Sequence, residues 1–303
     1  MYPCLLSTPI RTLILSLPPV LFPHPFISIP AFSFRSAGQN RDISITFLAK
    51  FFYATFLWAF ILALKVASQD PSQAPSTSNS FDPSDSNQVT ELLAPFKEAS
   101  KKWVEDVEKL SATNTQDGGD EHVLFIGSSS FRLWDNLPAD LAPYPIVKRA
   151  YGGAKFRDLA IHTPELVRAM KFNRAVIFIA NDVTGKEDDT PPETTRKLAH
   201  LVIAQLRREQ PNVQVFLLAV TPTPSRYEYW PRIQKTNQML KSLSVELQNV
   251  HYIPTATAFL DADGLPRAEY FKDDKLHLNQ QGYAVWSELI KRALAEFAPA
   301  CSK

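Results

Sequence analysis

The stretch VLFIGSSSFRLW, residues 123–134, places three consecutive serines directly after a short apolar run. The run has the length and composition of a strand that is buried on both faces of a sheet. Ligands of parallel α/β sheets bind at the carboxyl ends of the strands. The stretch therefore predicts a strand that ends in a candidate functional site.

Similar runs of β-branched, aliphatic and aromatic residues recur along the chain and alternate with stretches of helical periodicity. The expected strands are 122–127, 146–151, 175–180, 213–220 and 250–255, and the expected helices are 156–170, 192–209, 229–248 and 279–297. A further helix is expected from Pro95, with apolar residues at spacings of three and four: Phe96, Ala99, Trp103, Val107 and Leu110. This alternation predicts a three-layer α/β/α sandwich with a five-stranded parallel sheet.

The region before this body contains an uncharged apolar run at 51–64, bounded by Lys50 and Lys65. It is shorter than the roughly 20 residues of a spanning helix and fits the apolar part of a secretory signal, with Ala67 and Ser68 as a small-residue cleavage site. Residues 48–68 are therefore expected to be a signal peptide or, if uncleaved, an N-terminal anchor that associates with a membrane. Either alternative predicts an exported protein, periplasmic or extracellular.

Two flanking segments complete the predicted organisation. Residues 1–47 are rich in Pro and Phe and have no acidic residue before Asp42, so they are either a leader or lie upstream of the true translation start. Residues 69–88 are dominated by Ser, Asp, Pro and Gln and are expected to form a flexible linker. Residues 89–303 are expected to form the folded domain.

Composition excludes several classes of function. The net charge of the whole chain is +1, but the N-terminal segment is basic. The body of the chain is therefore mildly acidic, and nucleic-acid binding has no electrostatic support. The two cysteines, Cys4 and Cys301, lie at opposite ends of the chain and cannot form a disulfide framework or a thiolate metal site. The phosphate-binding, dinucleotide-binding and zinc-protease motifs are absent from the sequence.

A late segment, FKDDKLHLN, provides residues that would activate a serine. A serine hydroxyl is a weak nucleophile unless a base takes its proton and a carboxylate orients that base. Asp274 and His277 are three residues apart, a spacing that allows both contacts in one turn. Gly153 and Asn181, which also follow expected strands, would supply a backbone N–H and a side-chain amide to a developing oxyanion.

Together these residues resemble the SGNH or GDSL hydrolases, in the lysophospholipase-like variant that reads Gly-Ser-Ser-Ser followed by a Trp. The family blocks match Gly127-Ser128-Ser129 with Trp134, Gly153 within RAYGGAKF, Asn181-Asp182, and Asp274-x-x-His277 within DDKLHLNQQGYAVW. In the third block, Ile179 stands where the family has glycine. The likeness extends from about Lys101 to Leu294 and implies the flavodoxin-like fold of these hydrolases.

The resemblance implies a serine ester hydrolase without metal or cofactor. It selects Ser129 as the nucleophile, His277 as the base and Asp274 as its orienting acid, with an oxyanion hole formed by Ser129, Gly153 and Asn181. The expected partner is a small-molecule, carbohydrate or lipid ester, with acetyl or short acyl groups preferred. The alternatives are a lysophospholipase or thioesterase, and a non-catalytic carbohydrate- or lipid-binding domain of the same fold.

Several neighbouring residues have simpler interpretations. Ser128 and Ser130 are expected to serve the turn, and Asp273 competes with Asp274 for contact with the histidine. Asp182 is expected to order its own loop. The stretch TPTPSRYEYW, residues 221–230, is either a wall that faces the substrate or a proline-stiffened connection to a helix.

Overall fold

The computed structural model of the chain describes residues 81–297. The expected leader, signal or anchor at 1–68, on which the prediction of export depends, lies outside the described residues, as does most of the expected linker. The described residues contain a five-stranded parallel sheet in the order β2-β1-β3-β4-β5. Its strands are β1 Val123–Gly127, β2 Ile146–Ala150, β3 Arg174–Phe178, β4 Gln214–Leu218 and β5 Val250–Ile253.

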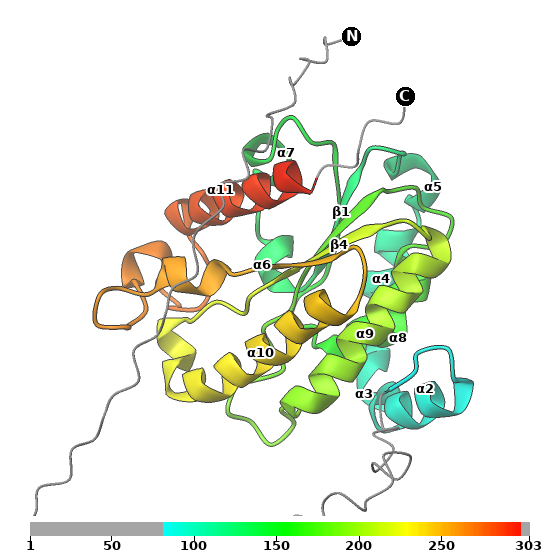
Figure 1. Cartoon of the computed structure of the whole chain (residues 1–303), viewed down its shortest axis with the longest axis horizontal. Helices are drawn as coiled ribbons and strands as arrows, with labels where there is room; N and C mark the ends of the chain where they lie inside the picture. The colour runs from blue at the N-terminus through cyan, green and yellow to red at the C-terminus, as the bar shows by residue number, and fades with distance from the viewer. Residues whose placement is uncertain (1–80, 298–303) are drawn as a thin grey trace, which may run out of the picture. The chain divides into compact units, whose positions relative to one another are not determined.

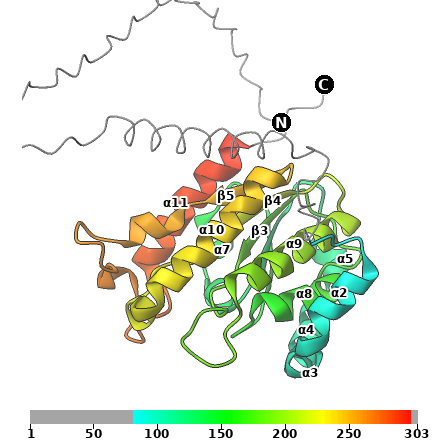
Figure 2. The same cartoon turned by 60° about the horizontal axis from the view of Figure 1, so that its bottom comes forward.

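Helices cover both faces of this sheet, so the predicted three-layer sandwich is confirmed (Figures 1 and 2). One layer contains α4 Val104–Ser111, α8 Phe156–Leu166, α9 Pro192–Glu209 and α10 Trp230–Glu246. The other layer contains α6 Ser129–Arg132, α7 Leu137–Asp140 and α11 Gln280–Glu296. The strand order is the one found in flavodoxin-like sheets.

Side chains alternate between the two faces along each strand, and each face has its own core. Leu124 and Ile177 pack with the helices of the first layer, whereas Phe125 and Phe178 pack with those of the second. In the second layer Trp286 lies 4.6 Å from Phe178 and 5.9 Å from Phe131, between ring centroids. Burial on both faces explains why the strands appear in the sequence as continuous apolar runs.

The expected boundaries agree closely with the structure at the helices of the body. The helix expected at 192–209 is observed as Pro192–Glu209, and Asn279 caps α11 by accepting from the backbone N–H groups of Gln281 and Gly282. The helix expected from Pro95 is broken into shorter pieces: η2 Ala94–Phe96, α3 Lys97–Ser100, η3 Lys101–Trp103 and then α4. The remaining short elements are α2 Ser86–Leu93, α5 Asn114–Asp117, η4 Pro224–Tyr229, η5 Thr255–Phe259 and η6 Ala268–Tyr270.

The predicted boundary between linker and domain at residue 88 is wrong. Phe81 is buried in the first core and lies edge-on to His200, with 5.9 Å between ring centroids. Asp85 caps α2 by accepting from the backbone N–H groups of Asn87 and Gln88. One buried aromatic ring and one helix cap therefore attach residues 81–88 to the domain, although their average composition is polar.

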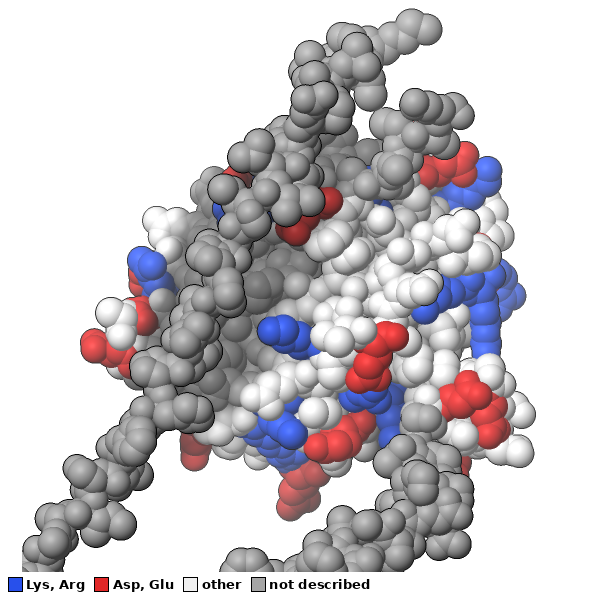
Figure 3. Space-filling model, in the orientation of Figure 1, with Lys and Arg blue, Asp and Glu red and all other residues white. Residues whose placement is uncertain are grey.

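The surface carries charges of both signs. On the face drawn in Figure 3, basic and acidic side chains are interspersed. Among the ion pairs of residues 81–297, exposed Lys109 lies 2.8 Å from Glu105 on the same helix. Within residues 81–297, no helix has the length and hydropathy needed to cross a membrane.

Candidate active site

The junction between β1 and α6 distinguishes the three serines. A Cβ atom on Gly127 would lie 2.2 Å from the carbonyl oxygen of Phe178, so only glycine allows β1 to run this close to β3 at its end. Ser128 has an extended backbone and is buried, and α6 begins at Ser129. The carbonyl of Ser130 accepts from the Tyr283 hydroxyl at 2.8 Å. The middle serine is therefore the one presented at the carboxyl edge of the sheet.

A continuous line of hydrogen bonds joins Ser129, His277 and Asp274. Nε2 of His277 lies 3.0 Å from Oγ of Ser129, and Nδ1 lies 2.6 Å from Oδ2 of Asp274. A neutral imidazole with its proton on Nδ1 donates to Asp274 and accepts from the serine hydroxyl. The structure thus brings together the three residues expected for nucleophile, base and orienting acid.

The turn around Asp274 holds its carboxylate in place. Oδ1 accepts from the backbone N–H groups of Leu276 and His277, each at 2.9 Å, and Lys275 adopts a left-handed conformation with φ 56°. Partial burial raises the pKa of Asp274. The hydrogen bonds from the His277 side chain and from these two N–H groups lower it by a larger amount, and the resulting pKa is about 2. Asp274 is therefore ionised wherever the imidazole is neutral. The neighbouring Asp273 is exposed and has no hydrogen bond within residues 81–297, so only Asp274 contacts the histidine.

Asn181 faces the same pocket and is held from two sides. Its Nδ2 donates to the carbonyl of Ala154 at 3.0 Å and lies 3.5 Å from Oγ of Ser128. Its Oδ1 accepts from Nη2 of Arg226 at 3.0 Å, while Nη1 of the same guanidinium donates to the carbonyl of Ala180 at 2.9 Å. An amide nitrogen has two N–H groups. One donates to Ala154, and the other is directed at Oγ of Ser128 over the longer distance of 3.5 Å.

Gly153 lies beside this arrangement rather than among the residues that line the pocket. Its φ is +77°, a conformation that residues with a Cβ rarely adopt, and the ring of Trp103 would lie 3.4 Å from a Cβ at this position. The next residue, Ala154, is the acceptor for Asn181. A hydrogen bond from Asn181 to the residue after Gly153 therefore joins the segments that carry the two expected oxyanion donors.

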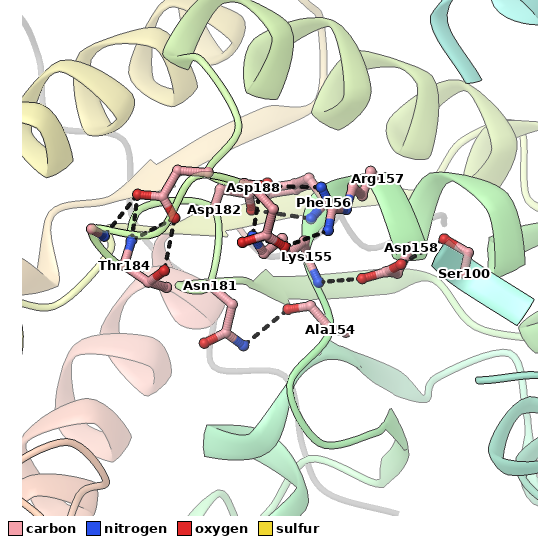
Figure 4. A network of polar contacts seen from close by, with 12 residues as sticks. Ser100, Ala154, Lys155, Phe156, Arg157, Asp158, Asn181, Asp182, Thr184 and Asp188 are labelled. Carbon is pink, nitrogen blue, oxygen red and sulfur yellow. Dashed lines mark hydrogen bonds and ion pairs between the residues drawn. The ribbon is translucent and has the colours of Figure 1, made fainter. Parts of the chain in front are cut away.

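A buried polar network fixes these two segments to each other (Figure 4). Oδ2 of Asp182 accepts from the backbone N–H of Phe156 at 3.0 Å, at the start of α8. The neighbouring Lys155 donates its backbone N–H to Asp158, which also accepts from the hydroxyl of Ser100. The sequence predicts only that Asp182 orders its own loop. In the structure it also bonds across to the segment that follows Gly153.

Arg226 was not identified from sequence as a residue that positions Asn181. Two alternatives were open for residues 221–230, a wall of the site and a proline-stiffened connection to a helix. The structure shows features of both. Thr221, Thr223 and Arg226 line the pocket, and η4 continues directly into α10. Burial lowers the pKa of the Arg226 guanidinium, an effect that Asp189 opposes.

The pocket beside Ser129 is small. Its volume is about 20 Å³, little more than the space of one water molecule. Apolar side chains form much of its wall: Phe178, Phe271, Leu276, Leu278 and Trp286. Within residues 81–297, no group of three His, Cys, Asp or Glu side chains is arranged to hold a metal ion.

Comparisons with known proteins agree with this fold and place the chain in a family. Among solved structures, a Streptococcus pneumonia protein assigned as a platelet activating factor is 22% identical, with a TM-score of 0.57 over 68% of this chain and 99% of that chain. An assigned acylhydrolase from Bacteroides fragilis is 19% identical, with a TM-score of 0.54 over 65% and 95% of the two chains. A GDSL-like lipase from Bacteroides thetaiotaomicron is 19% identical, with a TM-score of 0.51 over 65% and 97%.

At these identities the likeness to solved structures supports the fold alone. None of the curated proteins matches the chain. The model of the GDSL-like lipase/acylhydrolase family matches residues 114–285, a segment that contains every expected site residue. This chain belongs to the GDSL-like lipase/acylhydrolase family.

Proposed function

We propose that the protein is a serine carboxylesterase that removes acetyl or other short acyl groups through an acyl-enzyme. Membership of an acylhydrolase family supports the hydrolysis of esters. The observation that carries the assignment of roles is the hydrogen-bonded line from Ser129 through His277 to Asp274, at 3.0 and 2.6 Å.

The geometry supports the following sequence of steps. His277 takes the proton of Ser129 through Nε2 while Oγ attacks the ester carbonyl carbon. The backbone N–H groups of Ser129 and Gly153 stabilise the oxyanion together with the Asn181 N–H that otherwise makes the long contact with Ser128. When the C–O bond to the alcohol breaks, His277 returns its proton to the leaving oxygen. A water molecule then attacks the acyl group by the same route and regenerates Ser129.

The size of the pocket supports a short acyl group. A cavity of about 20 Å³ lined by both apolar and polar side chains has room for a methyl group, but a long chain would require side chains such as Phe271 and Leu278 to move. Lysophospholipase and thioesterase activities on long acyl chains are therefore less well supported. We expect kcat/KM for nitrophenyl esters to be highest for acetyl or propionyl and to fall as the chain lengthens.

Substitution of single serines tests the assignment of the nucleophile. Ser129→Ala is expected to abolish turnover of nitrophenyl acetate and labelling by a fluorophosphonate, with circular dichroism unchanged. Ser130→Ala is the matched control, because the Ser130 hydroxyl makes no hydrogen bond within residues 81–297 and its carbonyl bond to Tyr283 is kept, so it should retain both. Labelling of Ser129→Ala at the wild-type rate would refute the assignment. A folded wild-type protein that neither turns over nor is labelled would indicate a non-catalytic binding domain.

A further inference from the structure

A second, larger cleft lies next to the oxyanion segment. Its volume is about 460 Å³, and its walls come from three places. Trp103, Asp106, Lys109 and Leu110 belong to η3 and α4, and Arg132 ends α6. Ala150 ends β2, and Tyr151 and Gly152 follow it. Because β2 is an edge strand, the cleft lies along the outer edge of the sheet.

This cleft adjoins the nucleophile through α6 and through the glycine segment. Ser129 and Arg132 are the first and last residues of α6, and residues three apart lie on the same side of a helix. Nε of Arg132 is 3.1 Å from the position that a Cβ on Gly152 would occupy. The ring of Trp103 approaches the next residue, Gly153, from the same cleft. An ester held at Ser129 would thus have a small pocket on one side and this cleft on the other.

Arg132 provides an unpaired positive charge in the cleft. Its side chain is exposed and forms no ion pair or hydrogen bond with any residue in the described range 81–297, whereas Arg149 and Arg157 each bond an aspartate. Lys148, nearby, donates to the carbonyls of Arg132 and Trp134. Burial lowers the pKa of Lys148, Asp135 opposes this, and the charge of Arg132 lowers it further. The positive charges of Arg132 and Lys148 therefore repel one another at this edge of the sheet.

The other side chains of the cleft suit a polar ligand better than an acyl chain. Trp103 offers an aromatic surface, and Asp106 offers a carboxylate that can accept from hydroxyl groups. A lipid tail would require a continuous apolar wall, and the charged side chains of Asp106, Lys109 and Arg132 interrupt the wall of this cleft. A guanidinium matches the geometry of carboxylate and phosphate oxygens.

We propose that this cleft binds the alcohol part of the ester and that Arg132 recognises an anionic oxygen group, a carboxylate or a phosphate, carried by that alcohol. The proposal rests on the proposed esterase function and specifies its substrate class. The substrate would be a short acyl ester of a polyhydroxy alcohol with a negative charge. The acyl group would enter the small pocket, and the charged alcohol would leave through the large cleft.

Two matched pairs of esters test the proposal and distinguish the sources of the charge. One pair is an O-acetylated methyl glucoside and the corresponding methyl glucuronide, and the other is 1-acetylglycerol and 1-acetylglycerol 3-phosphate. For at least one pair we expect the wild type to favour the anionic member in kcat/KM. Arg132→Gln should lower that preference about 10-fold to 100-fold, the effect of losing a hydrogen bond to a charged group. Arg292→Gln, an exposed arginine of α11, is the control and should leave it unchanged.

A binding measurement keeps the proposal testable if none of these esters is hydrolysed. The folded Ser129→Ala variant is titrated calorimetrically with methyl glucuronide and with glycerol 3-phosphate, beside their neutral counterparts methyl glucoside and glycerol. Tighter binding of an anionic alcohol, lost when Arg132→Gln is added, would support the cleft even if the esterase proposal failed. The proposal would be overturned if the wild type hydrolysed and bound the charged and neutral members equally well. It would also be overturned if Arg132→Gln left the preference for the anionic member unchanged.

Discussion

The carboxylate of Asp182 accepts a hydrogen bond from the backbone N–H of Phe156 at 3.0 Å, and this bond joins the segments that follow β2 and β3. The adjacent Asn181 makes a second connection through the carbonyl of Ala154. The two proposed oxyanion donors, Gly153 and Asn181, lie immediately beside these bonds. We therefore expect Asp182 to act on the two proposed donors by positioning their segments and not by contact with the substrate.

Removal of the Asp182 carboxylate is expected to lower kcat more than it changes KM. Asp182→Ala leaves the N–H of Phe156 without its acceptor and loosens the segment that holds Gly153. We expect kcat for a nitrophenyl ester to fall about 10-fold to 100-fold, less than for complete loss of a donor, with a smaller change in KM. Asp182→Asn keeps an acceptor oxygen and should restore most of the activity. Equal losses in the two variants would contradict a role through this hydrogen bond.

The same carboxylate should make folding stability depend on pH. Burial raises the pKa of Asp182 to about 6, although the hydrogen bonds from Phe156 and Thr190 and the charge of Lys155 lower it and Asp158 raises it. A raised pKa in the folded state means that the contribution to stability is present below the unfolded pKa of about 3.9 and is lost as pH rises through about 6.

Asp182→Asn should therefore gain stability relative to the wild type as pH rises from 4 to 7, by about 3 kcal/mol. The measurement is the free energy of unfolding by urea for both proteins at several pH values. A difference between the two proteins that stays constant across this range would refute the assignment of the titration to Asp182.

The amide of Asn181 is expected to contribute directly to the transition state. Asn181→Ala removes one oxyanion donor, so kcat should fall about 10²-fold to 10³-fold with little change in KM. Arg226→Gln removes the bond that orients Oδ1 of Asn181, so its effect should be smaller and should disappear in the Asn181→Ala background. Full additivity of the two substitutions would show that Arg226 acts independently of Asn181.

The pair Asp273 and Asp274 allows a matched test of the orienting acid. Asp274→Asn should lower kcat about 10³-fold to 10⁴-fold, because the imidazole loses the partner that fixes its tautomer. Asp273→Asn removes the same charge one residue earlier, from an exposed side chain, and should change kcat less than twofold. Similar losses of kcat in the two variants would mean that the negative charge of this turn is important and that the contact between Asp274 and His277 is not.

Sequence reasoning was most successful where local composition reflects burial. The strands are buried on both faces, so each appears as an uninterrupted apolar run, and the polar residues that follow the runs mark the functional edge. Ser129 and Asn181 follow such runs, whereas Asp274 and His277 are predicted from their spacing of three in a late segment. Ser129, Asn181 and His277 line one pocket, and Asp274 bonds to His277 beside it.

Contacts between distant segments could not be predicted from the same patterns. The bond from Arg226 to Asn181 spans 45 positions, and the bond from Phe156 to Asp182 spans 26. The attachment of Phe81 to the domain was missed because one aromatic residue does not change the polar average of its segment. The large cleft at Arg132 also depends on packing between three elements, which no single motif reveals.

The junction at Gly127 gives the clearest prediction for stability. A Cβ there would lie 2.2 Å from the carbonyl oxygen of Phe178, a backbone atom of the paired strand that cannot move aside. Gly127→Ala is therefore expected to destabilise the fold by about 3 kcal/mol or more, a decrease of roughly 10 °C in Tm.

Gly264→Ala is the matched control for this substitution. Its φ is +78°, but a Cβ there would meet nothing within 4 Å, so it should cost only the strain of the left-handed conformation, about 1 kcal/mol. Thermal unfolding followed by circular dichroism measures both variants. Similar decreases in Tm would mean that the close approach of β1 to β3 is relieved by a shift of the strands, and the reason given for glycine at this junction would be wrong.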